Sequence, residues 1–303
     1  MNLVNIINRV QMPELPEVET IARDLNAAGL AGNTLTGARV YWGRTIAEPS
    51  AAEFCRLIRT KQIAGIGRRG KFLVIDLAGG WSLLMHLRMS GRLHLVPSGT
   101  ERLAHEHVAL ALEDGRELRF HDTRKFGRIY LVPDADGILG PLGPEPLAPA
   151  FTAAGLFKMT QARSRQVKPL LLDQRFIAGL GNIYTDEALW EAKIHPCRLS
   201  DSLSQNEVRA LHAGIRRVLQ RGLKNLGTSL GTGKANFYSV GRRRGRNRDE
   251  LKVFRRTGEL CPRCRTPIQR IRVGQRSTHI CPECQKLRGF KGSRGRGVEC
   301  SAK

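Results

Sequence analysis

Four cysteines near the end of the chain have the spacing of a metal site. Cys261-x-x-Cys264 is followed, after sixteen residues, by Cys281-x-x-Cys284, and a proline in each pair favours a tight turn that points both sulfurs at one ion. Four thiolates complete a tetrahedral zinc site and leave no position open for chemistry, so the spacing predicts one structural Zn2+. The alternative is a set of free or redox-active thiols. The basic stretch between the pairs predicts a zinc-stabilised hairpin that suits phosphate, or a plain solvated face.

A glycine-rich turn, Gly179-Leu-Gly-Asn182, leads into a helical pattern. Backbone N–H groups at the start of a helix carry partial positive charge and suit a phosphate group. Many such turns only cap a helix, so the turn alone leaves both interpretations open.

The stretch Met12-Pro-Glu-Leu-Pro-Glu17 would carry covalent chemistry if the chain began at Pro13. A free α-amino group has a pKa of about 7.7–8.0, against about 10.4 for lysine, so far more of it is an uncharged nucleophile at pH 7. Attack of a secondary amine on the anomeric carbon of a sugar gives an iminium, which makes later eliminations easy. Glu14 and Glu17 are candidates for the general acid and base. The alternative is a helix N-terminus with proline and acids in its first turn.

Composition indicates a polyanionic partner. The chain has 303 residues, with 50 Lys and Arg against 27 Asp and Glu, which gives a formal net charge of +23. Such a surface favours DNA or RNA, although a solubility tail or a ribosomal-type protein would share it. No apolar run reaches the roughly 18–20 residues of a membrane span, and the first eleven residues lack the features of a secretory signal. The seven cysteines are odd in number and dispersed, which predicts a reducing, cytoplasmic compartment.

Local patterns predict the elements that must position these residues. Val18, Ile21 and Leu25 recur at helical spacing up to Gly29. Strand patterns follow to about Val132, with a turn at residues 78–80 and a hairpin around Asp114-Gly115. Later, Ser204 and Glu207 predict a capping box ahead of a long helix.

The opening PELPEVET, the central GLGNIY and the four-cysteine finger together resemble the formamidopyrimidine-DNA glycosylase family. The segments KFLVIDL, HLRMSGRL, DTRKFGRIY, LGPEPL, KIHPCRL and LCPRC fall in the family's order, and the resemblance runs from Met12 to about Lys286. It implies an α+β multidomain fold with an N-terminal β-sandwich and flanking helices, a helix–two-turns–helix domain and a C-terminal zinc finger. It also implies that the protein excises oxidised purines from duplex DNA and then cleaves the strand at the abasic site.

The same resemblance implies the roles of individual residues. Pro13 matches the nucleophile, Glu14 the acid and base that opens the sugar ring, and Lys71 a lysine near the phosphate of the lesion. Glu17 would support the site, and Glu187 would help to read the base. Three side chains match those that fill the hole left by the flipped-out base: Met89, Arg124 and Phe126. The other implied DNA contacts are His105, Lys168, Asn182 and Arg276.

The expected domains are a catalytic β-sandwich at 12–134, a linker at 135–150, a helical domain with a lesion-capping loop at 151–257 and a zinc finger at 258–286. Residues 1–11 are expected to be a non-native or processed extension, and residues 287–303 a basic disordered tail. We expect a monomer, located with the nucleoid in the cytoplasm. The segment Thr232–Glu250 departs from the commonest family version, and Thr123 and Lys125 stand where Pro and Arg are frequent, so lesion preference stays open.

The eleven leading residues would bury the Pro13 nitrogen in a peptide bond. We therefore expect that Met12 is the translation start and that methionine removal exposes Pro13. Alternatives are a non-catalytic relative that binds damaged DNA and a zinc-finger protein of transcription or translation. A relative specific for pyrimidine lesions is the enzymatic alternative, but such relatives tend to begin PEGPE, whereas Leu15 stands in the third position here.

Overall fold

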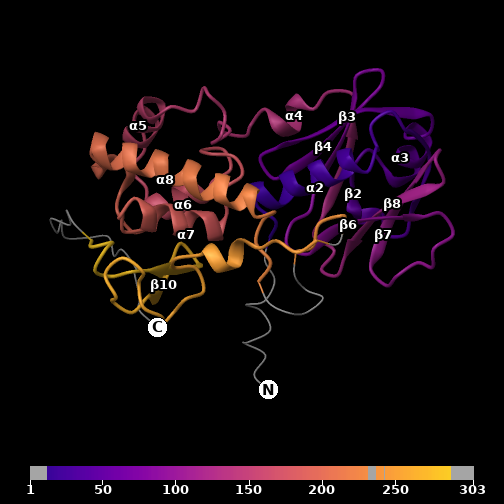
Figure 1. Ribbon diagram of the computed structural model, residues 1–303. Helices are drawn as coiled ribbons and strands as arrows, with labels where there is room; N and C mark the ends of the chain where they lie inside the picture. The colour runs from indigo at the N-terminus through magenta and orange to yellow at the C-terminus, as the bar shows by residue number, and fades with distance from the viewer. Residues whose placement is uncertain (1–11, 231–236, 242, 288–303) are drawn as a thin grey trace. The chain divides into compact units, whose positions relative to one another are not determined.

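The computed structural model describes residues 12–230, 237–241 and 243–287 (Figure 1). The chain folds as two compact units, one formed by Met1–Pro141 with Gly222–Arg248 and the other by Leu142–Arg221 with Asp249–Lys303. The expected extension at 1–11 and the tail beyond Leu287 lie outside the described residues. Within the described part of the chain, no helix has the length and apolar character that crossing a membrane requires.

The first unit opens with the predicted helix, α2 (Leu15–Ala27), which is confirmed. Its apolar side is buried, and Gly29 ends it with a positive φ of 70° that glycine adopts without strain. Along the helix, Glu19 pairs with Arg68 (3.2 Å) and the Asn26 side chain donates to the Ile66 carbonyl (2.9 Å). These contacts hold α2 beside residues 66–68. Because Glu19, near the start of the helix, contacts the later residue Arg68, the start of α2 points toward the residues that follow Arg68.

Nine strands form the sheet of the first unit: β1 (Thr34–Val40), β2 (Ile46–Glu48), β3 (Lys61–Arg69), β4 (Phe72–Leu77), β5 (Trp81–His86), β6 (Gly91–Pro97), β7 (Glu106–Leu112), β8 (Arg116–Asp122) and β9 (Arg128–Val132). Their order is β2-β9-β5-β4-β3-β1-β7-β8-β6. The register between β1 and β3 contains two residue pairs, against six between β4 and β5. The sheet therefore divides at this junction into two halves. The predicted β4–β5 and β7–β8 hairpins are confirmed.

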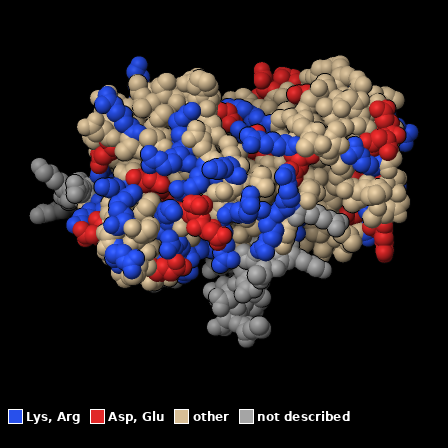
Figure 2. All heavy atoms as spheres, viewed as in Figure 1, with Lys and Arg blue, Asp and Glu red and all other residues tan. Residues whose placement is uncertain are grey.

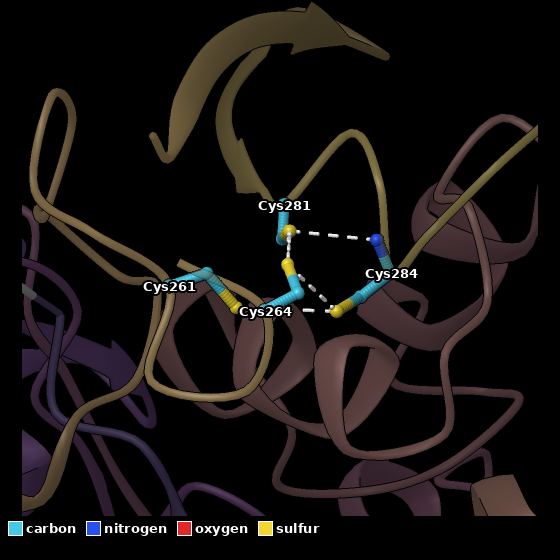
Figure 3. A group of neighbouring side chains, drawn as sticks. All are labelled: Cys261, Cys264, Cys281 and Cys284. Carbon is cyan, nitrogen blue, oxygen red and sulfur yellow. Dashed lines mark hydrogen bonds between the residues drawn. The ribbon is translucent and has the colours of Figure 1, made fainter. Parts of the chain in front are cut away.

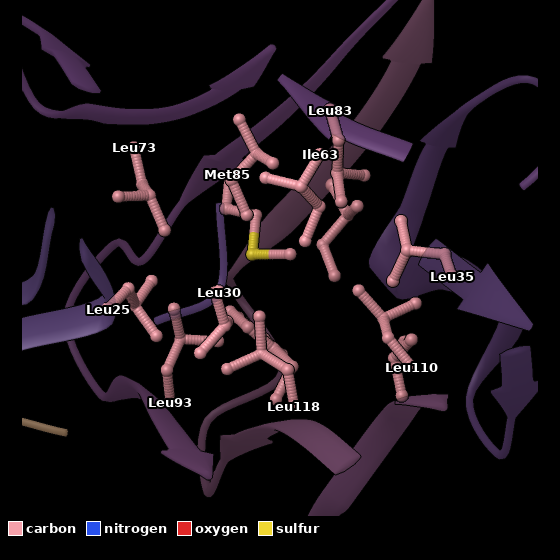
Figure 4. Packing of buried hydrophobic residues seen from close by; sticks show 14 of the residues in the cluster. Leu25, Leu30, Leu35, Ile63, Leu73, Leu83, Met85, Leu93, Leu110 and Leu118 are labelled. Carbon is pink, nitrogen blue, oxygen red and sulfur yellow. The ribbon is translucent and has the colours of Figure 1, made fainter. Parts of the chain in front are cut away.

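The two halves of the sheet share one apolar core. Side chains from β3, β4 and β5 belong to the same buried cluster as side chains from β1, β6, β7 and β8, with Leu25 of α2 among them (Figure 4). Full burial of each such side chain contributes about 1.5–3 kcal/mol. This packing confirms the predicted β-sandwich with a flanking helix. The described residues of this unit also form α3 (Ala51–Leu57), α4 (Asp136–Leu139) and the short 3-10 helix η1 (Gly43–Thr45).

The second unit is helical and ends in a small hairpin. Its helices are α5 (Ala153–Gln161), α6 (Val167–Leu172), α7 (Asn182–Glu191) and α8 (Gln205–Lys224), and its strands are β10 (Gln269–Val273) and β11 (Arg276–Ile280). The predicted capping box of α8 is confirmed, since the Ser204 N–H donates to Glu207 (2.8 Å) and the Glu207 N–H donates to Ser204 Oγ (3.3 Å). Gly274 and Gln275 both have positive φ, which is the two-residue turn that strand twist favours.

Candidate active site, DNA contacts and zinc centre

The start of α2 brings Pro13, Glu14 and Glu17 together. The Glu14 N–H donates to Glu17 Oε2 (2.9 Å), and the Glu14 carboxylate accepts in return from the Glu17 N–H, which completes a capping box. Pro13 is buried, and Glu14 is only 2% exposed. A carboxylate held this firmly beside residue 13 is well placed to exchange protons with a group that reacts there.

Lys71 stands in the turn between β3 and β4, at the end of the sheet toward which the start of α2 points. It is buried, and His86 is near enough to feel its charge. Burial, together with the charges of Arg88 and Lys71, lowers the pKa of His86 to about 3. The imidazole is therefore neutral at pH 7 and adds no positive charge beside the lysine.

Glu17 links α2 to a distant segment of the same unit. The Thr228 N–H donates to Glu17 Oε1 (2.7 Å), and Gly227 adopts a φ of +81°. A β-carbon on Gly227 would lie 2.9 Å from the Glu17 side chain, so only glycine allows this approach. The segment that precedes the predicted lesion-capping loop is thus attached to the first turn of α2. Residues 231–236 of that loop lie outside the described residues.

The three predicted hole-filling residues lie on two adjoining turns. We call residues 122–127 the wedge loop. Its Phe126 side chain is 48% exposed, and the Arg124 guanidinium lies 4.9 Å from the Phe126 ring centroid. Met89 is half-buried on the other turn, next to Ser90, whose hydroxyl accepts from the Arg124 N–H (3.2 Å). The structure therefore joins the turn that carries Met89 to the loop that carries Arg124 and Phe126.

Asp122 organises the wedge loop, and sequence reasoning missed it. Its buried carboxylate accepts from the N–H groups of Gly127 (2.7 Å) and Arg124 (3.1 Å) and from the Ser90 hydroxyl. An acid that bonds backbone N–H groups two and five residues ahead is a turn-forming device. The signal was present in DTRKFG, where an aspartate precedes a short loop that ends in glycine.

His105 is exposed at the end of a loop that a buried charge cluster holds in place. Arg119 donates to the carbonyls of Thr100 (2.6 Å) and Glu101 (3.1 Å) and pairs with two buried carboxylates, Glu106 (3.1 Å) and Glu117 (2.8 Å). The His105 carbonyl accepts from the Asp122 N–H (2.9 Å), so His105 adjoins the wedge loop.

In the second unit, Asn182 lies beside the hairpin turn that carries Arg276. The Asn182 side chain donates to the Ser277 carbonyl (3.0 Å), and Arg276 is exposed. Asn182 is also the first residue of α7, where N–H groups favour an anion. Figure 2 shows Lys and Arg side chains gathered on the visible face of the helical and finger elements.

Lys168 is fully buried, at 0% exposure. Its ammonium contacts Asp186 (2.6 Å) and the Ser277 carbonyl (3.1 Å), and Asp186 also accepts from the backbone N–H of His279 (2.9 Å). This ion pair holds the hairpin against α6 and α7. Lys168 therefore contacts Ser277, the residue next to Arg276, and has no exposed surface.

Glu187 is buried and saturated by backbone donors. Its carboxylate accepts from the N–H groups of Lys252, Val253 and Phe254, at 2.9 to 3.1 Å. Burial raises the pKa of Glu187, while these three donors and Arg221 oppose the rise. The residue ties α7 to the segment that leads into the finger.

The four predicted cysteine ligands converge (Figure 3). Their sulfur atoms lie within 4.8 Å of one another, and the three measured Sγ–Sγ contacts are 3.3, 3.4 and 3.9 Å. A tetrahedron with Zn–S bonds of about 2.3 Å has edges of about 3.8 Å, so one zinc ion fits these ligands. Hydrogen bonds with Thr266 lower the pKa of Cys264 to about 6, whereas burial raises the pKa of Cys281 to about 12 and also raises that of Cys284. Three apolar residues pack against the cluster: Trp190, Val253 and Ile268.

Comparisons with known proteins agree with this arrangement. Three family models match in chain order: the formamidopyrimidine-DNA glycosylase N-terminal domain at residues 12–129, its H2TH domain at 142–233, and the zinc finger found in FPG and IleRS at 258–287. The formamidopyrimidine-DNA glycosylase of Protochlamydia amoebophila is 45% identical over 275 residues, which is 91% of this chain and 100% of the relative. That of Chloroflexus aurantiacus is 47% identical over 278 residues, which is 90% of this chain and 98% of the relative.

Solved structures give the same result. A complex of the Lactococcus lactis enzyme with DNA containing an abasic site has a TM-score of 0.82 and 34% identity, and covers 90% of this chain and 99% of that chain. The Thermus thermophilus protein has a TM-score of 0.81 and 39% identity, and covers 90% of this chain and 98% of that chain. The finger is therefore of the FPG type, with four cysteines for one structural zinc ion. By sequence, domain order and fold, this chain belongs to the formamidopyrimidine-DNA glycosylase family.

Proposed function

We propose that this protein is a bifunctional DNA glycosylase and abasic-site lyase that removes oxidised purines, formamidopyrimidines and 8-oxoguanine, from duplex DNA. The observation that carries the proposal is the buried start of α2, where Glu14 adjoins Pro13 and Lys71 stands at the same end of the sheet. Relatives of this chain have been solved with DNA that contains Fapy-dG, carbocyclic 8-oxo-G or an abasic site.

The reaction requires that the bond between Met12 and Pro13 be cleaved, because only then is the Pro13 nitrogen a secondary amine. The amine attacks the anomeric carbon, the damaged base leaves with a proton, and an iminium forms between Pro13 and the opened sugar. Glu14 moves protons during ring opening, and elimination then releases the 3′ and 5′ phosphates in turn. Water finally hydrolyses the iminium and frees Pro13.

The remaining residues act on DNA. Met89, Arg124 and Phe126 fill the space that the flipped-out nucleotide leaves, and Arg124 bonds the unpaired base. Asn182, Arg276, His105 and Lys71 contact phosphates. We assign Lys168 and Glu187 positioning roles, because the first supports Ser277 next to Arg276 and the second supports residues 252–254.

The protein is proposed to act as a monomer, because one chain supplies the nucleophile, the wedge loop and the finger. Its proposed substrate places it with chromosomal DNA in the cytoplasm.

A second function, binding of damaged DNA without catalysis, is favoured by one observation: eleven residues precede Met12 in the chain. The two functions are separated by comparing the full chain with protein that begins at Pro13. With DNA carrying one abasic site, we expect borohydride to trap a covalent adduct with the shorter protein and not with the uncut full chain. The protein that begins at Pro13 should also excise 8-oxoguanine or formamidopyrimidine from duplexes with single lesions, and the uncut full chain should not. Binding by both proteins with no adduct from either would establish the non-catalytic function.

Asp122→Asn is expected to weaken binding to duplex DNA that carries a tetrahydrofuran abasic analogue by roughly ten- to hundredfold. The substitution replaces an oxygen that accepts from Gly127 with an N–H2 group, and hydrogen bonds to charged groups contribute about 1.5–3 kcal/mol. Fluorescence anisotropy would measure the affinity, with undamaged duplex as the control. Equal losses on the two duplexes would show that the carboxylate does not act through the wedge loop.

A further inference from the structure

The segment that departs from the family pattern packs against the sandwich through two of its described residues. Phe237 is buried in the main apolar cluster, and Val240 packs against that cluster. The Arg92 guanidinium lies 6.0 Å from the Tyr238 ring centroid. The burial of Phe237 and the packing of Val240 fix the position at which residues 243–248 begin.

A buried carboxylate of α2 holds the next turn. Asp24 accepts from the Gly241 N–H (3.1 Å) and pairs with the Arg243 guanidinium. Within the turn, the Ser239 N–H donates to the Arg243 carbonyl (3.0 Å), and the Arg243 N–H donates to Ser239 Oγ (3.1 Å). Because Asp24 is almost completely buried, its pairing with Arg243 attaches this turn to the helix that starts at the catalytic residues.

Residues 245–247 form hydrogen bonds with residues 225–229, which follow α8. The Arg246 N–H donates to the Asn225 carbonyl (2.8 Å), and the Asn247 N–H donates to the Gly227 carbonyl (3.1 Å). Gly245 donates to Ser229 Oγ (3.0 Å). A β-carbon at Gly245 would lie 2.3 Å from the Gly227 carbonyl oxygen, so this close backbone approach requires glycine.

This bonding produces a row of three arginines. Gly245 and Asn247 are buried, whereas Arg244, Arg246 and Arg248 are exposed. Arg244 and Arg246 form single β-bridges with Tyr238 and Thr228, and Arg248 lies in the short 3-10 turn η3 (Asn247–Glu250) that follows. We call these three residues the arginine row. The planar guanidinium group bonds phosphate in a bidentate manner, and a row fixed on the backbone loses less entropy on binding than a mobile tail.

The arginine row is connected to the catalytic end of the same unit. The Asn247 side chain donates to Thr228 Oγ1 (3.0 Å), and the Thr228 N–H donates to Glu17 (2.7 Å), three residues from Glu14. Two hydrogen bonds thus separate the row from the capping box beside Pro13. Duplex DNA that presents its sugar to Pro13 is the polyanion that this position favours, in preference to RNA or an acidic protein.

We propose that the arginine row is a DNA-backbone contact of this chain, held in place by Asp24 and Asn247. The proposal rests on the proposed function and extends it. Each arginine neutralises a phosphate near the lesion, and the contact adds affinity without reading the bases.

The test is the salt dependence of binding to a duplex with a tetrahydrofuran abasic analogue. For the variant Arg244→Gln, Arg246→Gln and Arg248→Gln combined, the slope of log K against log salt should become shallower by about 2.7, since each phosphate contact contributes about 0.9. The matched control replaces three exposed arginines of the same unit, Arg23, Arg56 and Arg59, by glutamine. It removes the same charge and should keep the original slope within about 0.5. Equal slopes for both triple variants would overturn the proposal, as would a greater loss of affinity for RNA than for DNA.

Asp24→Asn tests whether the row must be held in place. It keeps the arginine row, so the slope should stay unchanged while affinity falls by about two- to tenfold, the cost of ordering a freed segment. Unchanged affinity would overturn the role of Asp24. Borohydride trapping by unsubstituted protein that begins at Pro13 is run alongside. An adduct together with unchanged slopes rejects the arginine row alone, whereas absence of an adduct rejects the proposed function.

Discussion

Glu14→Gln is expected to slow excision of 8-oxoguanine by roughly 10²–10⁴-fold, the usual contribution of a positioned acid or base. Glutamine keeps the size of the side chain and its carbonyl oxygen, so it can still cap α2 by accepting from the Glu17 N–H. It can neither give nor take the proton that ring opening requires. The loss should therefore appear in the rate of the chemical step, measured in single turnover with protein that begins at Pro13.

The control is Glu19→Gln on the same helix. Glu19 is partly exposed and pairs with Arg23 (2.9 Å) and Arg68 (3.2 Å), so the substitution removes the same charge one turn from the site. Its excision rate should stay within about threefold of the unsubstituted protein, which matches the modest value of exposed ion pairs. Glu14→Gln protein with an unchanged single-turnover rate would remove Glu14 from the mechanism.

Cys281→Ser is expected to remove zinc and lower the affinity for lesion-containing DNA by at least about 100-fold. The finger packs few apolar residues, and zinc supplies about 10–16 kcal/mol of binding free energy in comparable small modules. Without the ion, the β10–β11 hairpin loses its support and Arg276 loses its position beside Asn182. A charge-assisted hydrogen bond is worth about 1.5–3 kcal/mol, so two lost phosphate contacts account for the expected change.

Zinc content from atomic absorption and affinity from anisotropy would be measured on the same samples. Cys55→Ser is the matched control, because Cys55 lies in α3 and outside the four-cysteine cluster. It should keep one zinc ion and normal affinity. A zinc-free Cys281→Ser protein that binds lesion DNA normally would contradict the assigned role of the finger.

Elements that depend on local pattern could be predicted from the sequence. The helix from residue 15, the hairpin at Asp114-Gly115, the capping box of α8 and the cysteine site each depend on residues close together in the chain. The chemistry proposed for Pro13 and Glu14 also rests on residue type, since a proline amine and a neighbouring glutamate have few equivalents. Those features needed no knowledge of distant contacts.

Contacts between distant residues could not be predicted in this way. Nothing near Lys168 indicates that its partner is Asp186, or that the pair supports Ser277, which is 109 residues away. Glu187 is bonded to backbone groups 65 to 67 residues later, and Asp24 to residues 217 and 219 positions away. An ionisable residue at the surface and one buried in an ion pair have the same local sequence, so only the fold distinguishes a phosphate contact from its support.

The central claim is that the Pro13 nitrogen forms the covalent bond to DNA. Protein that begins at Pro13 should be trapped with borohydride on abasic DNA, digested and analysed by tandem mass spectrometry. The reduced sugar is expected on the nitrogen of Pro13. A sugar found on a lysine such as Lys71, with Pro13 unmodified, would contradict the account.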